Sequence, residues 1–174
     1  MVPPETRKRY AGEICTVANI NSEALFKAFT DVSREDFVGQ GPWRVLAGSA
    51  PGQWQPQVVN VSDPCELYRD VAVYLDASKS LANGNPSTLA PWLDSLNLSP
   101  GKSVFHLGCG TGYYTAIVAE IVGLRGQVTA AEVDPVLAAQ ARTSLSRYSN
   151  VRVVEGDGGS LDVGRCDAIL INAG

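Results

Sequence analysis

Three glycines at alternate positions follow a short apolar stretch in the segment VFHLGCGTGYY at 104–114. Glycine lets the backbone turn tightly and approach a ligand closely, because no Cβ atom interferes. A predicted helix begins directly after the loop, and the free N–H groups of a helix N-terminus favour anionic ligands. Gly108, Gly110 and Gly112 are therefore candidate ligand-binding residues, although tight packing of a strand against a helix would also explain them.

Two acidic residues stand where the next predicted strands end. Glu132 closes the first strand after the glycine loop, where a carboxylate can accept hydrogen bonds from ribose hydroxyls. Asp157 in EGDGG ends the third predicted strand and is a candidate partner for the amino group of an adenine. Open α/β sheets bind ligands at the carboxyl ends of their strands, so the loop and both acids are expected at one edge.

The spacing also distinguishes between cofactors. Dinucleotide-binding loops follow G-x-G-x-x-G, which requires glycine at 113, where this sequence has Tyr113. A G-x-G-x-G loop with an acid after the second strand and GD after the third is similar to the S-adenosylmethionine-dependent methyltransferases. This disfavours a nicotinamide cofactor. A DNA amino-methyltransferase would carry Asn/Asp-Pro-Pro-aromatic after the fourth strand, where NAG stands instead.

His106, the only histidine of the chain, stands two positions before the loop. A neutral imidazole attracts a positive sulfonium less than an acid would, and an imidazolium would repel it. Two roles for His106 stay open: contact with the cofactor, or a strand-end histidine hydrogen-bonded to the backbone.

Strands alternating with helices must position these residues. The pattern predicts strands at 102–108, 127–133, 151–157 and 166–174, and helices at 113–123 and 136–148. Such alternation predicts an α/β fold with a parallel sheet of β-α-β units. Residues 101–174 are expected to form a partial cofactor-binding domain of the Rossmann-like type.

Residues 1–100 read as a helical or irregular N-terminal extension. Helices are expected within 1–20, 22–31 and 83–98, an irregular or short-stranded segment at 38–66, and a strand at 70–76.

The last predicted strand, DAILINA, is apolar enough for burial on both faces. The sequence given stops just after it, and an edge strand would expose apolar side chains and unpaired backbone groups. We expect either that the natural chain continues with further strands, which is favoured, or that another chain covers the edge at 166–174.

Composition excludes several classes of function. The net charge of −4 makes nucleic acid a poor partner. No stretch is long enough to span a membrane, and the N-terminus lacks the apolar region of a secretory signal. The four cysteines are scattered without metal-site spacing, which predicts free thiols, a cytoplasmic protein and no metal.

More narrowly, the chain resembles the protein-L-isoaspartate (D-aspartate) O-methyltransferase family. The similarity is carried by VSREDFV at 32–38, LNLSPGKSVFHLGCGTGYYTAIVAEIVG at 96–123, VRVVEGDGG at 151–159 and DAILINAG at 167–174. The resemblance implies a class I methyltransferase fold and S-adenosylmethionine as cofactor, with S-adenosylhomocysteine as product. By that resemblance the three loop glycines would bind the cofactor, Glu132 its ribose and Asp157 its adenine.

Two departures from the family concern the chemistry. Its catalytic loop, of the type G-Q-T-I-S, corresponds here to GNPST at 84–88. Ser87 and Thr88 still offer hydroxyls as catalytic candidates, but capping of the following helix would also explain them. The second departure is His106, where the family has an acid.

Two functional hypotheses follow. The first is an S-adenosylmethionine-dependent methyltransferase acting on a small-molecule or protein carboxylate, or on another small nucleophile. The second is a catalytically silent relative that serves as a binding module, with a homo-oligomer or a second chain pairing along its last strand. Neither hypothesis involves nucleic acid or a membrane.

Overall fold

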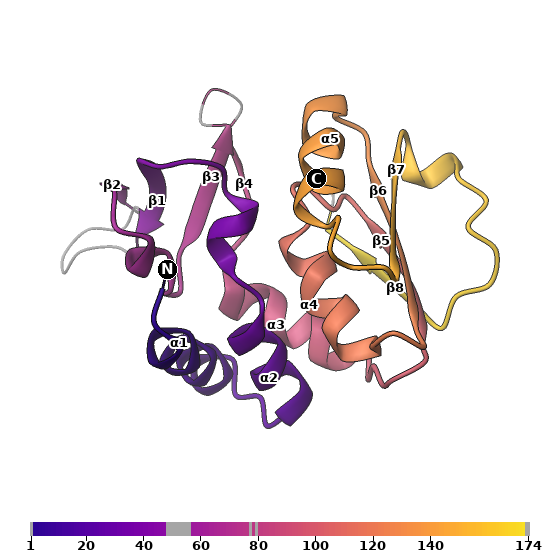
Figure 1. The fold of residues 1–174 in the computed structure, drawn as a ribbon, viewed down its shortest axis with the longest axis horizontal. Coiled ribbons are helices and arrows are strands. Elements are labelled where there is room, and N and C mark those ends of the chain that lie inside the picture. Colours follow the sequence, from indigo (N-terminus) through magenta and orange to yellow (C-terminus); the bar gives the residue numbers. More distant parts are fainter. Residues whose placement is uncertain (1, 48–56, 77, 79, 173–174) are drawn as a thin grey trace. The chain divides into compact units, whose positions relative to one another are not determined.

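The computed structural model describes residues 2–47, 57–76, 78 and 80–172. The chain divides into two compact units, Met1–Pro91 and Trp92–Gly174, and each unit is considered by itself (Figure 1). Within the described residues, no helix combines the length and the apolar character needed to cross a membrane.

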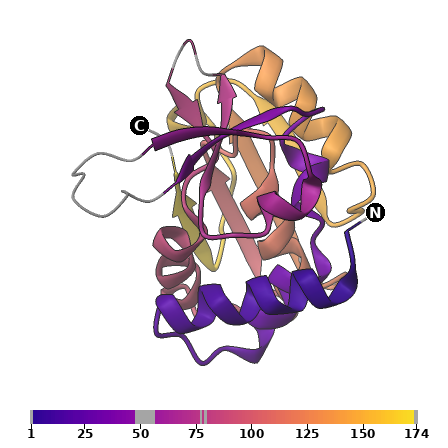
Figure 2. The same cartoon turned by 90° about the vertical axis from the view of Figure 1, so that its left-hand side faces the viewer.

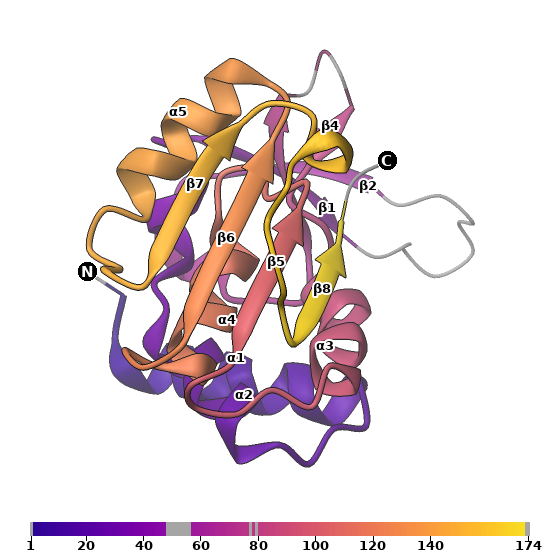
Figure 3. The ribbon, with the colours of Figure 1, turned by 90° about the vertical axis from the view of Figure 1, so that its right-hand side faces the viewer.

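The C-terminal unit contains a parallel sheet in the order β7-β6-β5-β8 (Figure 3). Its strands are β5 (Ser103–Leu107), β6 (Gln127–Glu132), β7 (Val151–Glu155) and β8 (Ala168–Ile171). These strands fall where the sequence predicts them, and the α/β fold with a parallel sheet is confirmed. The chain leaves β5 toward β6 on one side and returns as β8 on the other, so β5 is a central strand.

Two helices connect these strands, as predicted. Helix α4 (Tyr113–Val122) begins after Gly112 and ends at Gly123. Helix α5 (Pro135–Ser144) is capped by Asp134, whose carboxylate accepts hydrogen bonds from the backbone N–H groups of Val136 and Leu137. In Figures 1 and 3 both helices lie on the same face of the sheet, and the segment after β7 crosses the other face.

Strand β8 lies at the edge of the sheet and differs from the expectation of burial on both faces. Leu170 is buried, but Ile169 is 51% exposed and Ile171 59% exposed. Side chains alternate between the two faces of a strand, so both isoleucines share one face. No part of the chain that the structure describes buries that face at β8.

The N-terminal unit begins with helices α1 (Pro4–Val17) and α2 (Glu23–Asp31) (Figure 2). Both helices were predicted, and Ser22 caps α2 by accepting a hydrogen bond from the backbone N–H of Leu25. The two helices pack through Tyr10, whose ring makes an edge contact with that of Phe29 at a centroid distance of 6.1 Å.

The N-terminal unit also contains a sheet, in the order β2-β1-β3-β4, in which the strand predicted at 70–76 appears as β3. Its strands are β1 (Trp43–Ala47), β2 (Gln57–Val61), β3 (Ala72–Asp76) and β4 (Leu81–Ala82). All of its pairs are antiparallel. Two strands lie within the segment at 38–66 that was expected to be irregular or short-stranded, although 48–56 lies outside the described residues.

Arg34, in the VSREDFV segment, is fully buried at the centre of this unit. Its guanidinium donates hydrogen bonds to the carbonyl oxygens of Leu67 and Arg69, at 2.5 and 2.9 Å, and to that of Val71. It also lies over the ring of Tyr10, 5.7 Å from the centroid. Arg34 therefore fixes the turn before β3, and this segment has a structural function.

Candidate functional site

The glycine loop requires glycine most strictly at Gly112. This residue has a φ of +98°, in a region that side-chain-bearing residues rarely adopt. A Cβ atom there would lie 2.6 Å from Cδ1 of Leu145. Gly112 directly precedes α4, so the loop delivers the chain to a helix N-terminus, as the sequence predicts.

Glu132 binds the glycine loop directly. It lies at the end of β6 and is only 7% exposed. One carboxylate oxygen accepts a hydrogen bond from the backbone N–H of Gly110 at 2.8 Å, and the other accepts one from Asp134 at 3.0 Å. Each carboxylate oxygen has a further lone pair, so Glu132 can hold the loop and still accept a hydrogen bond from a ligand hydroxyl. The contact with the loop was not predicted.

Asp157 lies at the same edge of the sheet. Its carboxylate accepts hydrogen bonds from the Ser160 hydroxyl at 2.8 Å and the Gly159 backbone N–H at 2.9 Å, and these bonds lower its pKa. A Cβ atom at Gly158 would lie 2.9 Å from Cγ of Leu107 and 3.0 Å from Cβ of Ala131. The turn after β7 therefore lies against the ends of β5 and β6, where the glycine loop begins.

His106 is fully buried in β5. Its Nδ1 shares a hydrogen bond of 2.8 Å with the hydroxyl of Thr115, in the first turn of α4. The hydrogen-bond partner is a side chain, whereas the alternative of a strand-end histidine predicted a partner in the backbone. Burial lowers the pKa of His106 to about 4, so the imidazole is neutral at physiological pH. Nε2 has no hydrogen-bond partner among the described residues.

Cys109, inside the loop, carries an inert thiol. Burial and the nearby charge of Glu132 raise its pKa to about 12. A protonated thiol is a poor nucleophile, so covalent chemistry at Cys109 is disfavoured.

The two catalytic candidates belong to the N-terminal unit. Helix α3 (Pro86–Ser95) begins before Ser87 and Thr88, so both lie inside its first turn and neither is the predicted cap. Asp70 performs the capping: its carboxylate accepts hydrogen bonds from the Ser87 backbone N–H at 2.9 Å and the Ser87 hydroxyl at 2.5 Å. Thr88 is exposed, and its backbone N–H donates to the carbonyl of Asn85.

The structure therefore brings together one group of predicted residues. The glycine loop, Glu132 and Asp157 converge at the carboxyl ends of β5, β6 and β7, and His106 lies buried beside the start of the loop. Asp70 was missed by sequence reasoning because it is distant from Ser87 along the chain, and no local pattern indicates their contact.

Comparisons with known proteins agree with this geometry. A protein-L-isoaspartate O-methyltransferase of Methanococcus aeolicus is 38% identical over 118 residues, which are 63% of this chain and 54% of that protein. The chain thus spans little more than half the length of this relative.

Two solved structures share the fold. A protein-L-isoaspartate O-methyltransferase superposes with a TM-score of 0.74 at 24% identity, over 97% of this chain and 48% of that one. A β-aspartate methyltransferase (PCMT) from Plasmodium falciparum, in complex with S-adenosyl-L-homocysteine, has a TM-score of 0.70 at 17% identity, over 96% of this chain and 73% of that one.

The family model described as protein-L-isoaspartate(D-aspartate) O-methyltransferase (PCMT) matches residues 57–174, which include β2, the GNPST segment, the glycine loop and both acids. The chain belongs to this family.

Proposed function

We propose that the chain is an S-adenosylmethionine-dependent O-methyltransferase that transfers a methyl group to a carboxylate, with isoaspartyl residues of proteins as the first acceptor to test. The observation that carries this proposal is the contact between Glu132 and Gly110, which joins an acid to a glycine loop at the carboxyl end of a parallel sheet. Family membership supports the same reaction.

The residues at this edge fit the cofactor. At Gly112 and Gly158 the backbone lies against Leu145 and Leu107, so these two glycines hold the loop and the turn after β7 close to the ends of β5 and β6. Two buried polar atoms of the loop region, Nε2 of His106 and Oγ1 of Thr111, have no partner among the described residues. Such atoms are rare in folded proteins, and a bound ligand would satisfy them.

Each residue has a role in this proposal. Glu132 accepts hydrogen bonds from the ribose hydroxyls while it holds Gly110, and Asp157 accepts one from the adenine amino group. Gly108, Gly110 and Gly112 bring the backbone N–H groups of the loop to the cofactor. His106 lies beside them as a neutral group, and Ser87 and Thr88 are the candidates for contact with the acceptor.

The protein has little proton transfer to perform. When bound, S-adenosylmethionine supplies a methyl group on a positively charged sulfur, which is electrophilic without further activation. The contribution of the chain is to hold cofactor and acceptor in line, and orientation of that kind supplies much of the rate. An acceptor carboxylate is already ionised at neutral pH, so a general base is not required.

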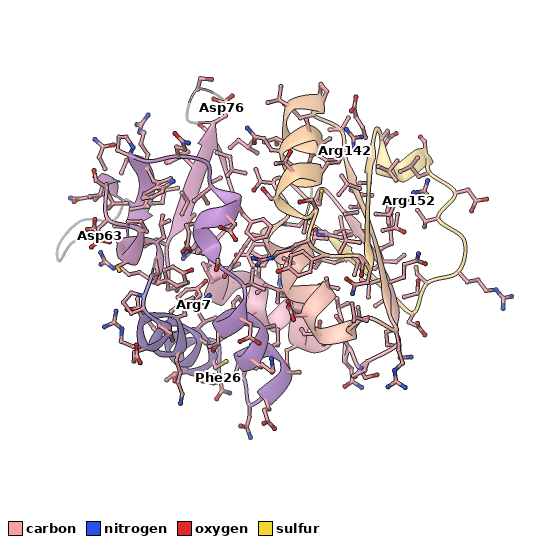
Figure 4. All side chains as sticks on the ribbon, in the orientation of Figure 1. Arg7, Phe26, Asp63, Asp76, Arg142 and Arg152 are labelled. Atoms are coloured by element: carbon pink, nitrogen blue, oxygen red, sulfur yellow. The ribbon has the colours of Figure 1, made fainter. Side chains whose placement is uncertain are left out.

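Calorimetry with S-adenosylhomocysteine tests the proposal. Glu132→Gln should weaken binding at least about tenfold, since it removes charge-assisted acceptors from both the ribose and Gly110. Glu155→Gln is the matched control: Glu155 ends the neighbouring strand, aligns with Glu132 in the register and pairs with Arg142 of α5, which is labelled in Figure 4. Absence of binding to the unmodified chain, or equal binding by both variants, would contradict the proposal.

A catalytically silent relative is the alternative, favoured by the altered GNPST segment and by the exposed Ile169 and Ile171 of β8. Methyl-ester formation on an isoaspartyl peptide separates the two. Cofactor binding without methyl transfer supports the silent module. We also propose a cytoplasmic location, because free cysteines such as the four that the structure describes persist in a reducing compartment.

A further inference from the structure

Asp70 takes up both hydrogen-bond donors of Ser87 in the N-terminal unit. Oδ1 of Asp70 accepts a hydrogen bond from the backbone N–H of Ser87 at 2.9 Å, and Oδ2 accepts one from the Ser87 hydroxyl at 2.5 Å. A carboxylate only accepts hydrogen bonds, so the hydroxyl proton of Ser87 is directed at Asp70. Ser87 therefore offers a ligand the lone pairs of its Oγ atom and no proton.

The turn that carries Asp70 is held on both sides. The guanidinium of the buried Arg34 donates hydrogen bonds to the carbonyl oxygens of Arg69, at 2.9 Å, and of Val71. The backbone N–H of Val71 also donates to the carbonyl oxygen of Arg69 at 2.9 Å, which closes a three-residue turn with Asp70 at its centre. These contacts fix the position from which the carboxylate reaches Ser87.

The segment before Ser87 is held at its other end by β3. The backbone N–H of the buried Asn83 donates to the carbonyl oxygen of Val73 at 3.0 Å, and the backbone N–H of Val73 donates to Oδ1 of Asn83 at 2.9 Å. Residues 84–86 alone separate this pair from Ser87. With both ends of the short segment anchored, the Oγ atom of Ser87 is preorganised to accept a hydrogen bond.

We propose that Asp70 is a positioning residue that makes Ser87 accept a hydrogen bond from a peptide N–H group of the substrate. The inference rests on the proposed function, in which Ser87 contacts the substrate, and it narrows that substrate to peptides. A peptide carries N–H groups on both sides of an isoaspartyl residue, whereas a small carboxylate without an N–H or O–H group has no donor for Ser87. A carboxylate oxygen would meet only lone pairs at this Oγ atom, so Thr88 remains the candidate donor to the carboxylate.

Peptide binding by the chain in the presence of S-adenosylhomocysteine tests this proposal. The probes are an isoaspartyl peptide and the same peptide with N-methyl groups on the two amides that flank the isoaspartyl residue. The unmodified chain should bind the N-methylated peptide about tenfold more weakly, the loss expected for one hydrogen bond. In Asp70→Asn the side-chain amide donates to Oγ of Ser87 and occupies a lone pair, so the difference should fall below about threefold, and in Ser87→Ala it should vanish.

The comparison of the two peptides distinguishes positioning from a purely structural contribution of Asp70. A purely structural contribution would weaken the binding of both peptides alike and leave the difference between them in place, which would overturn the inference. Asp63→Asn is the matched control, because Asp63 is exposed and caps another turn of the same unit by accepting a hydrogen bond from the Cys65 backbone N–H at 2.9 Å. This variant should keep the full difference, and its loss there would also overturn the inference.

The outcomes separate this inference from the function on which it rests. If the unmodified chain binds neither S-adenosylhomocysteine nor the isoaspartyl peptide, the proposed function fails and the inference with it. If the chain binds and methylates the isoaspartyl peptide but binds the N-methylated peptide equally well, only the inference is overturned. Should Asp70→Asn fail to fold, as circular dichroism would reveal, Ser87→Ala decides: a difference that vanishes supports the inference, and one that persists overturns it.

Discussion

Gly112 and Leu145 approach each other so closely that a Cβ atom on Gly112 would lie 2.6 Å from a methyl carbon of Leu145. The contact joins the end of the glycine loop to the residue that follows α5. The shape of the cofactor loop therefore depends on the packing of the next helix as well as on its own backbone.

Gly112→Ala should destabilise the protein by about 2–4 kcal/mol, from the strained φ and the collision with Leu145 together. Urea unfolding measures the change. Gly101→Ala is the matched control, since Gly101 has a similar φ of +92° but nothing within 4 Å of the added carbon, and about 1 kcal/mol is expected there. Gly112→Ala should also weaken cofactor binding, and Leu145→Ala in the same chain should restore part of that affinity because it removes the colliding side chain. Equal losses of unfolding free energy in the two glycine variants would argue against the contact.

Stability should depend on pH through His106. Its pKa is about 4 in the folded protein and about 6.5 when unfolded, so the unfolded chain takes up the proton first as pH falls. The stability from the neutral imidazole is fully present above pH 6.5 and is lost between pH 6.5 and 4, on the order of 3 kcal/mol. Urea unfolding across this range checks the slope. His106→Gln should flatten it, and an unchanged slope in that variant would contradict the assignment.

Arg34→Met should destabilise the protein by about 3–5 kcal/mol, because it removes the guanidinium that donates to the buried carbonyl groups of Leu67 and Val71. Thermal and urea unfolding measure the loss. Arg44→Met is the control: Arg44 is exposed and lies over the ring of Tyr74, so about 0.5 kcal/mol or less is expected. Similar effects of the two substitutions would show that the buried arginine is dispensable.

Asp70→Asn should cost about 1 kcal/mol, since an amide replaces the carboxylate that accepts both hydrogen bonds from Ser87 at the start of α3. Ser87→Ala should cost less, because the backbone hydrogen bond remains. A double-mutant cycle measures the coupling, and Thr88→Val, at an exposed neighbouring position, should leave stability unchanged. Zero coupling between Asp70 and Ser87 would refute the cap.

The sequence predicted the C-terminal unit well because its signals are local. Asp134-Pro135 marks the start of α5, Gly123 marks the end of α4, and each strand is a short apolar run between such signals. In the N-terminal sheet only β3 was predicted as a definite strand, at 70–76. Strand β1 pairs with β2 and β3 across long segments of Gly, Pro and Gln, and Val58 and Val59 of β2 are exposed, so no apolar face marks it.

The candidate site shows the same division. The glycine loop, Glu132 and Asp157 could be placed at one edge because their spacing follows the β-α-β repeat. The contacts of His106 with Thr115, of Gly112 with Leu145 and of Asp70 with Ser87 could not. Each depends on how a helix packs or where a turn lies, which periodicity does not specify.

The register of the parallel sheet has a consequence for the order of folding. Val104 pairs with Val128, and Val128 pairs with Val151, so each of these contacts closes a single β-α-β unit. Val104 also pairs with Ala168, but that contact closes a loop that contains both β6 and β7. Contacts that close short loops cost less chain entropy and form sooner. During synthesis, β5, β6 and β7 can therefore assemble with the glycine loop and both acids in place before β8 joins, and nascent chains ending soon after Asp157 should already acquire protection from proteases on addition of S-adenosylhomocysteine.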